Sequence, residues 1–276
     1  MLAPGYQNNA TWPTEVGRML VDFKDGFVVE NRMRNLADAI CQAAEEVAPN
    51  ADPRRALGTA SLKRSTIDSY NRIAHQFAEQ WCDYPPVAPL EKLLALIPAN
   101  SQVLDLGCGP GHHASYIADC GHSVLGVDLS TSMLDIARRR DRRILFQQQD
   151  AQKLSFPRHT FDAIWCAAMP MHVAREEFTT FLTGLNRILK PGGIVAINLP
   201  VGACSEVIDF AADQRFFENY WSARDVAIPL YDAGFAILQD DYGRLERTTH
   251  ELEHPVDWLT MFATTVPPVT SNTSKN

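Results

Sequence analysis

Glycines at alternate positions follow an apolar run near the middle of the chain, and an aspartate ends the next apolar run. Residues 103–111 read VLDLGCGPG and residues 124–128 read VLGVD. Such runs are typical of buried strands, and glycines in the turn let the backbone approach a ligand closely or adopt positive φ. A carboxylate at the end of the second strand is placed to accept hydrogen bonds from a ribose diol. The pattern predicts a site for a nucleoside-containing cofactor.

The spacing of the glycines indicates which cofactor. A dinucleotide-binding turn has the pattern G-x-G-x-x-G, with a pyrophosphate at the following helix N-terminus. Here the glycines are Gly107, Gly109 and Gly111, and His112 occupies the place of the third dinucleotide glycine. A ligand without phosphate tolerates this bulk better, and S-adenosylmethionine is such a ligand. We expect His112 and His113 to open the helix and to find local hydrogen-bond partners.

Five ordered segments resemble the class I S-adenosylmethionine-dependent methyltransferases. They are similar to the first motif, the second motif, the adenine-reading segment, the fourth strand and the loop before the fifth strand, at residues 104–111, 126–130, 149–157, 161–165 and 189–193. The resemblance covers roughly residues 66–264 and is greatest to small-molecule enzymes of the ubiquinone/menaquinone-biosynthesis type. It implies methyl transfer from S-adenosylmethionine to a small-molecule acceptor, leaving S-adenosylhomocysteine.

One subgroup of these enzymes has a leucine-rich segment after the fourth strand and a later Arg-x-Phe near a tyrosine. Arg215 and Tyr220 match the second element, with phenylalanines at 216 and 217. The first element reads AMPMHV at 168–173, with Met-Pro-Met where leucines are usual. Because of this departure, the resemblance does not identify the acceptor or the atom that is methylated.

The resemblance implies a set of cofactor-binding residues. They are Asp105, Gly107, Cys108, Gly109, Asp128, Leu129, Met133, Asp150, Ala151 and Ala167. Asp105 would attract the ammonium group, Asp128 would accept from both ribose hydroxyls, and Asp150 would accept from the adenine amino group. Each strand-end aspartate has an alternative interpretation: Asp128 as the N-cap of the next helix, and Asp150 as the cap of a turn.

The acceptor side has two candidate catalytic residues, His172 and Tyr70. His172 follows the fourth strand closely, and an unperturbed imidazole pKa of about 6.5 suits proton uptake; its alternative role is to pack beside the cofactor or bond a backbone carbonyl. Tyr70 closes the pocket or simply packs in an apolar stripe. The candidate substrate-binding residues are Tyr70, Met171, Arg215 and Tyr220. Arg215 would favour an anionic acceptor, or else form a surface ion pair.

Composition narrows the remaining possibilities. The chain has 25 basic and 33 acidic residues, a net charge of −8, which argues against a nucleic-acid partner. Six cysteines without a C-x-x-C pair predict neither a metal site nor a disulfide framework. The N-terminus does not resemble a signal peptide, and no apolar run approaches the ~20 residues of a membrane span. We therefore expect a cytoplasmic protein that needs no metal.

Alternating strand and helix patterns predict an α/β fold, with a Rossmann-like, mostly parallel seven-stranded sheet and helices on both faces. The expected strands lie near 102–106, 123–128, 143–148, 161–167, 193–199, 235–242 and 257–263. The expected helices lie from Ser65 onward and near 112–120, 131–140, 175–189 and 222–233. By resemblance, the last strand runs antiparallel between the fifth and sixth, and the helix from Ser65 covers the cofactor pocket.

Three regions are expected along the chain: an N-terminal helical extension over 1–60, a methyltransferase domain over 61–264 and a flexible tail over 265–276. The extension packs on the domain or makes a homodimer. Two other functions are compatible with the sequence. One is a non-catalytic cofactor-binding or assembly module; the other is a nucleotide-dependent oxidoreductase, against which His112 and the adenine-reading segment argue.

Overall fold

The structure is a computed structural model that describes residues 58–81, 88–202, 205–211, 214–244 and 257–266; it does not describe the side chains of 81, 205–215 and 242–244. The chain divides into two compact units, residues 1–51 and 52–276, and the described residues belong to the second. Most of the predicted N-terminal extension and of the predicted tail lies outside the described residues.

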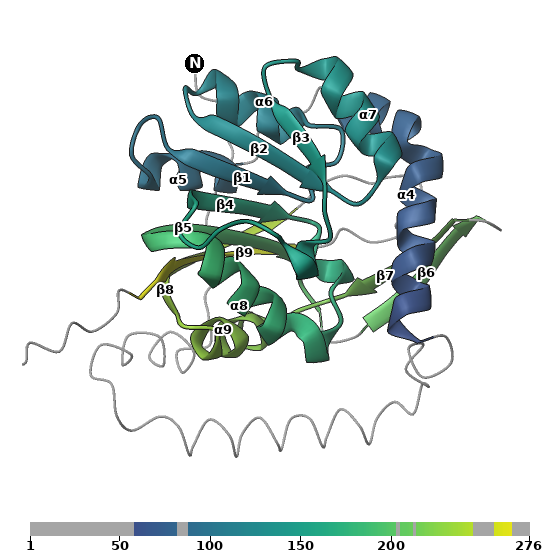
Figure 1. Cartoon of the computed structure of the whole chain (residues 1–276). Helices are drawn as coiled ribbons and strands as arrows, with labels where there is room; N and C mark the ends of the chain where they lie inside the picture. Colours follow the sequence, from purple (N-terminus) through teal and green to yellow (C-terminus); the bar gives the residue numbers. More distant parts are fainter. Residues whose placement is uncertain (1–57, 82–87, 203–204, 212–213, 245–256, 267–276) are drawn as a thin grey trace, which may run out of the picture. The chain divides into compact units, whose positions relative to one another are not determined.

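A seven-stranded sheet forms the centre of this unit (Figure 1). In chain order its strands are β1 Gln102–Leu106, β2 Ser123–Asp128, β3 Leu145–Gln148, β4 Phe161–Ala167, β5 Leu189–Pro200, β8 Phe235–Arg244 and β9 Asp257–Thr265. The spatial order is β3-β2-β1-β4-β5-β9-β8, and β9 pairs antiparallel with both β5 and β8. The fold class and the insertion of the last strand are as predicted.

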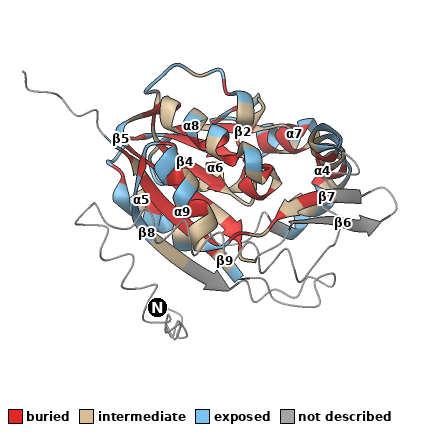
Figure 2. Ribbon diagram, turned by 90° about the horizontal axis from the view of Figure 1, so that it is seen from below, coloured by how far each residue is buried: buried red, intermediate tan, exposed pale blue. Residues whose placement is uncertain are grey.

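Helices cover both faces of the sheet. They are α5 Ala88–Leu96, α6 His112–Asp119, α7 Thr131–Arg140, α8 Phe178–Ile188 and α9 Ala223–Asp232. Side chains alternate along a strand, so Leu104 of β1 packs in the cluster with α8 and α9, whereas Val103 packs with α5 and α6. The central strands are buried on both faces, which explains their continuous apolar runs (Figure 2).

A long helix, α4 Thr59–Trp81, corresponds to the helix expected from Ser65. It contacts α7 and three short segments: the strand β7 Gln214–Asn219 and the 3₁₀ turns η2 Ala151–Lys153 and η3 Pro170–His172. Because α7, η2 and η3 follow β2, β3 and β4, α4 lies at the carboxyl ends of these strands, where ligands bind in doubly wound sheets (Figure 1). No helix among the described residues is long and apolar enough to cross a bilayer.

Local details differ from the expectations. The predicted loop 189–193 belongs to β5, whose pairing jumps from Phe161–Leu189 to Ala163–Ile194, so the residues between form a bulge. The predicted helix 175–189 is divided into a 3₁₀ turn, η4 Arg175–Glu177, and α8. The short helix α5 was not expected.

A two-stranded hairpin, β6 Ser205–Ala211 and β7, was also not predicted, and it is separate from the main sheet. Phe216 and Phe217 are both buried, so β7 lacks the alternation that marks a strand with one solvent face. The hairpin lies beside α4 (Figure 1).

Candidate active site

The turn between β1 and α6 depends on glycine. Gly107, Gly109 and Gly111 have φ of 77°, 50° and 80°, a region that other residues rarely adopt. A Cβ on Gly107 would lie 2.4 Å from the Cβ of Met169, so this position has no room for a side chain. The amides of Gly107 and Cys108 donate to the carbonyl of Val127 at 2.8 and 3.0 Å, which holds the turn against the end of β2.

The carboxylate of Asp128 is oriented by two backbone amides of this region. Gly109 N donates to Oδ2 at 2.9 Å and Ser130 N donates to Oδ1 at 2.8 Å. Burial raises the pKa of Asp128, and the amides of Ser130, Gly109 and Leu129 oppose that rise. A carboxylate has about four acceptor positions, so this one can still accept from further donors. Two vicinal ribose hydroxyls match this arrangement.

The alternative role of Asp128 as a helix N-cap is wrong. The N-cap of α7 is Ser130, whose hydroxyl accepts from Met133 N at 3.2 Å. Asp128 precedes the cap and its side chain turns back toward the glycine turn.

Asp105 is a buried carboxylate in need of a partner. It is 2% exposed, and its Oδ2 has no hydrogen-bond partner in the described part of the chain. Burial, and then the charge of Asp128, raise its pKa to about 7, and the amide of Ala114 lowers it. A buried carboxylate oxygen without a partner is unfavourable, and a bound ammonium group would satisfy it. A pyrophosphate would instead add negative charge beside two carboxylates, so these residues fit S-adenosylmethionine better than a dinucleotide.

Asp150 is both a turn cap and half of an ion pair. It is the N-cap of η2, accepting from Gln152 N at 3.0 Å, so its alternative role as a cap is confirmed. Lys63 of α4 also lies 2.6 and 2.7 Å from its two oxygens. These contacts leave an acceptor position on Oδ2. Sequence reasoning missed Lys63, because a single lysine in a helix gives no signal of a partner 87 positions away.

Tyr70 and His172 form a hydrogen-bonded pair. The Nδ1 atom of His172 lies 2.6 Å from the carbonyl oxygen of Phe217, and Nε2 lies 3.1 Å from the Tyr70 hydroxyl. A carbonyl only accepts, so Nδ1 carries the proton and Nε2 of the neutral ring accepts from Tyr70. Burial lowers the pKa of His172 to about 4 and raises the pKa of Tyr70. Both groups are therefore neutral near pH 7. His172 bonds a backbone carbonyl, as its alternative role predicted.

The segment around His172 is held by β7. Asn219, which is fully buried, donates from Nδ2 to the carbonyls of Met171 and Val173 at 3.0 and 2.7 Å. Met171 itself is buried in the main core cluster. The Tyr220 side chain is half-buried and its carbonyl accepts from Arg175. In the strand register of the hairpin, Arg215 of β7 lies opposite Asp209 of β6, and the Arg215 side chain is outside the described part of the structure.

The other expected cofactor residues lie around the same turn and strand ends. Cys108 and Met133 are buried, and Leu129, Ala151 and Ala167 are half-buried. His112 and His113 open α6 as predicted, and His113 Nδ1 accepts from Trp165 Nε1 at 3.1 Å. The expectation of a local partner is not met for Nδ1 of His112, which is buried without a hydrogen-bond partner among the described residues. Burial lowers their pKa values to about 4 and 3. Within the described ranges, no cluster of three His, Cys, Asp or Glu side chains could hold a metal ion.

Comparison with known proteins bears on the same region. The model of a methyltransferase domain family matches residues 103–193. Malonyl-[acyl-carrier protein] O-methyltransferase of Pectobacterium atrosepticum is 33% identical over 157 residues, which cover 51% of this chain and 58% of that protein. The chain thus spans little more than half the length of this relative.

Two further proteins match more extensively. Trans-aconitate 2-methyltransferase of Deinococcus radiodurans is 30% identical over 182 residues, 61% of this chain and 69% of that protein. The crystal structure of 1,6-didemethyltoxoflavin-N1-methyltransferase of Burkholderia thailandensis, with bound S-adenosylhomocysteine, has the same fold. Its TM-score is 0.56 at 21% identity, over 79% of this chain and 92% of that one. A relative matched at 30% identity over more than two thirds of its length shows common membership, and the chain therefore belongs to the class I S-adenosylmethionine-dependent methyltransferases.

Proposed function

We propose that this enzyme transfers the methyl group of S-adenosylmethionine to a small-molecule acceptor that binds between α4, η3 and β7. The observation that carries the proposal is the position of Met169, which lies between the cofactor turn and the Tyr70–His172 pair. The Met169 side chain fills the space that a Cβ on Gly107 of the cofactor turn would occupy, and Met169 lies three positions before His172. The oriented carboxylate of Asp128 and the neutral Tyr70–His172 pair therefore belong to one region.

In this proposal the chain's residues bind and orient the reactants. When bound, S-adenosylmethionine supplies an electrophilic methyl group on a sulfonium, so the protein contributes mainly alignment and exclusion of water. Asp105 holds the ammonium group, Asp128 holds the ribose and Asp150 accepts from the adenine amino group. Tyr70 and His172 line the acceptor side, with Tyr220 and Arg215 on the segment that follows β5.

We propose a carboxylate as the acceptor group. The two sequence relatives are named for trans-aconitate and for malonyl-[acyl-carrier protein], and both the aconitate and the malonyl group carry a carboxyl group. A carboxylate is already ionised at neutral pH and needs no general base. This suits a His172 whose two ring nitrogens are engaged and whose pKa of about 4 makes it a weak base. The cation of Arg215 would favour such an anion.

A phenolic or hydroquinone acceptor is the second candidate, as in the ubiquinone/menaquinone-biosynthesis type of enzyme. Such an acceptor arrives protonated, and His172 would then serve as the general base. The observation that favours this candidate is that Nε2 of His172 already accepts from a phenol hydroxyl, that of Tyr70. An acceptor hydroxyl would take the place of Tyr70 there and donate its proton to Nε2.

Calorimetric titration with S-adenosylhomocysteine tests the cofactor site. We expect micromolar binding by the unaltered chain, strong weakening in Asp128→Ala and no response to NADH. No binding by the folded, unaltered chain would contradict the proposal. A radiolabelled methyl-transfer assay then compares di- and tricarboxylic acids with hydroquinones, since base-labile methyl esters form only from the former.

We also propose a reducing, cytoplasmic location and assembly through the N-terminal extension. The described cysteines Cys108, Cys120 and Cys166 are free thiols, which suits a reducing compartment. Light scattering of the full chain tests for a homodimer, and a monomer at micromolar concentration would contradict that part.

A further inference from the structure

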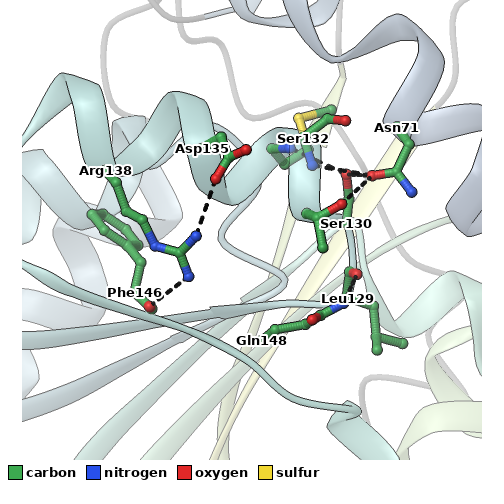
Figure 3. Close-up of polar contacts among 10 residues, drawn as sticks. Asn71, Leu129, Ser130, Ser132, Asp135, Arg138, Phe146 and Gln148 are labelled. Atoms are coloured by element: carbon green, nitrogen blue, oxygen red, sulfur yellow. Dashed lines mark hydrogen bonds and ion pairs between the residues drawn. The ribbon is translucent and has the colours of Figure 1, made fainter.

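Asn71 links α4 to the first turn of α7 by hydrogen bonds. Its Oδ1 accepts from the hydroxyl of Ser130 at 2.8 Å and from the amide of Ser132 at 3.1 Å (Figure 3). The hydroxyl of Thr131 lies at 3.4 Å from the same oxygen. Asn71 therefore supplies an acceptor where the first amides of a helix need one.

Ser130 connects this contact to the cofactor site. Its hydroxyl donates to Asn71 and accepts from Met133 N, while its amide donates to Oδ1 of Asp128. Ser130 is 2% exposed, so water has little access to replace a lost partner. The position of the Ser130 amide, and with it the direction of the Asp128 carboxylate, depends on what holds the Ser130 side chain.

The contact belongs to a wider docking of α4 on the cofactor region. Lys63 and Asn71 are eight positions apart, a spacing that places both on one face of a helix. Lys63 reaches Asp150 after β3, and Asn71 reaches Ser130 after β2. The same helix therefore contacts the segment expected to read adenine and the segment expected to hold the ribose.

We propose that Asn71 is a positioning residue for cofactor binding, which holds the Ser130 amide so that both Asp128 oxygens face the ribose hydroxyls. This inference rests on the proposed function. Asn71 acts through Ser130 and Asp128, so it increases the affinity for ligands with both ribose hydroxyls although it does not contact them. Without Asn71, the Ser130 hydroxyl needs another acceptor, and the loop between β2 and α7 is free to shift.

The test is isothermal titration calorimetry on the full chain with two ligands, S-adenosylhomocysteine and its 2′,3′-dideoxy analogue. We expect Asn71→Ala to raise the Kd of S-adenosylhomocysteine about tenfold, a factor that corresponds to about 1.4 kcal/mol. The Kd of the analogue should change much less, because it lacks the hydroxyls that Asp128 reads. Alanine is a better helix former than asparagine, so a weakened α4 would not explain the loss.

Two variants serve as controls. Gln76→Ala removes an exposed amide from the same helix and should leave both Kd values unchanged. Asn71→Asp keeps an oxygen acceptor, and its charge is favourable beside the N-terminus of α7, so it should restore most of the affinity for S-adenosylhomocysteine.

Several outcomes would overturn the inference. They are unchanged binding in Asn71→Ala, an equal loss for both ligands in that variant, or a failure of Asn71→Asp to restore affinity. In each of these cases the unaltered chain still binds S-adenosylhomocysteine, and the proposed function stands. If the unaltered chain binds neither ligand, the proposed function fails together with the inference.

Discussion

The hydroxyl of Tyr70 donates to Nε2 of His172, which joins two residues that are 102 positions apart. Their rings also meet edge to face, with centroids 5.5 Å apart. The other nitrogen of His172 donates to the carbonyl of Phe217, and the amide of Phe217 donates to Thr66 of α4 at 3.1 Å. Helix α4, the turn η3 and the strand β7 are thus connected through consecutive hydrogen bonds at the proposed acceptor side.

Removing the Tyr70 hydroxyl should change the titration of His172. Tyr70→Phe keeps the ring and its contact with Phe216, but it leaves the Nε2 lone pair without a donor. Without this donor the neutral ring is less stable, so we expect the pKa of His172 to rise from about 4 by about one unit. The rise stays small because burial still disfavours the charged form. Titration of the His172 ring protons by NMR measures the shift. An unchanged pKa would show that the hydroxyl does not donate to Nε2.

Replacing Asp128 should weaken cofactor binding. Asp128→Asn keeps the size of the side chain, but its NH₂ group can accept neither from a ribose hydroxyl nor from one of the two backbone amides that bond the carboxylate. We expect a rise of at least tenfold in the Kd of S-adenosylhomocysteine, measured by calorimetry. Asp135→Asn, on the exposed side of α7, is the matched control and should bind normally. Equal effects of the two variants would contradict a specific role for Asp128.

Cofactor binding should weaken in acid because of Asp105. Its pKa of about 7 means that the carboxyl is ionised above this pH and protonated below it. Only the ionised form attracts an ammonium group. The Kd of S-adenosylhomocysteine should therefore be nearly constant above pH 7.5 and rise as the pH falls toward 6. Asp105→Asn should bind more weakly at pH 8 and lose most of this dependence; a wild-type pH profile in the variant would contradict the assignment.

The same aspartate should lower the stability of the ligand-free protein at alkaline pH. Its pKa lies above the ordinary value of 3.8, so the folded state holds the proton more tightly than the unfolded state. The resulting stability is present below pH 3.8 and is lost as the pH rises to 7. Asp105→Asn should thus increase the free energy of unfolding at pH 8, by at most about 4 kcal/mol. Urea unfolding at pH 8 measures this change, and a destabilised variant would contradict it.

Gly107 and Gly192 allow backbone strain to be separated from steric overlap. Both have φ near 76°, but a Cβ at 107 meets Met169 at 2.4 Å, whereas nothing lies within 4 Å at 192. Gly192→Ala should cost about 1 kcal/mol in the free energy of unfolding, from the positive φ alone. Gly107→Ala should cost clearly more, and Met169→Ala in the same chain should recover part of the loss. Equal costs at the two glycines would show that the overlap is relieved without penalty.

The strand pattern, the glycine turn and the strand-end aspartates could be predicted from the sequence because each depends on neighbouring residues. A strand buried on both faces is a continuous apolar run, as in residues 194–197 of β5, and a backbone at positive φ selects glycine at 107 and 109. Such local rules predicted the order of the elements along the chain, whereas the antiparallel insertion of the last strand was expected from the family resemblance. They also located a carboxylate at the end of β2, and its binding to the ribose stays a prediction. They failed at β7, where consecutive buried phenylalanines hide the strand period.

The partners of the site residues were decided by the tertiary structure. Lys63 meets Asp150, Asn71 meets Ser130 and His172 meets the carbonyl of Phe217, across 87, 59 and 45 positions of the chain. Each contact forms because α4 and β7 pack at the carboxyl ends of the strands, and no spacing in the sequence specifies that packing. The tautomer of His172 and the raised pKa of Asp105 follow from burial and from these neighbours, since solvation and hydrogen bonding set the charge of a side chain only after the chain has folded.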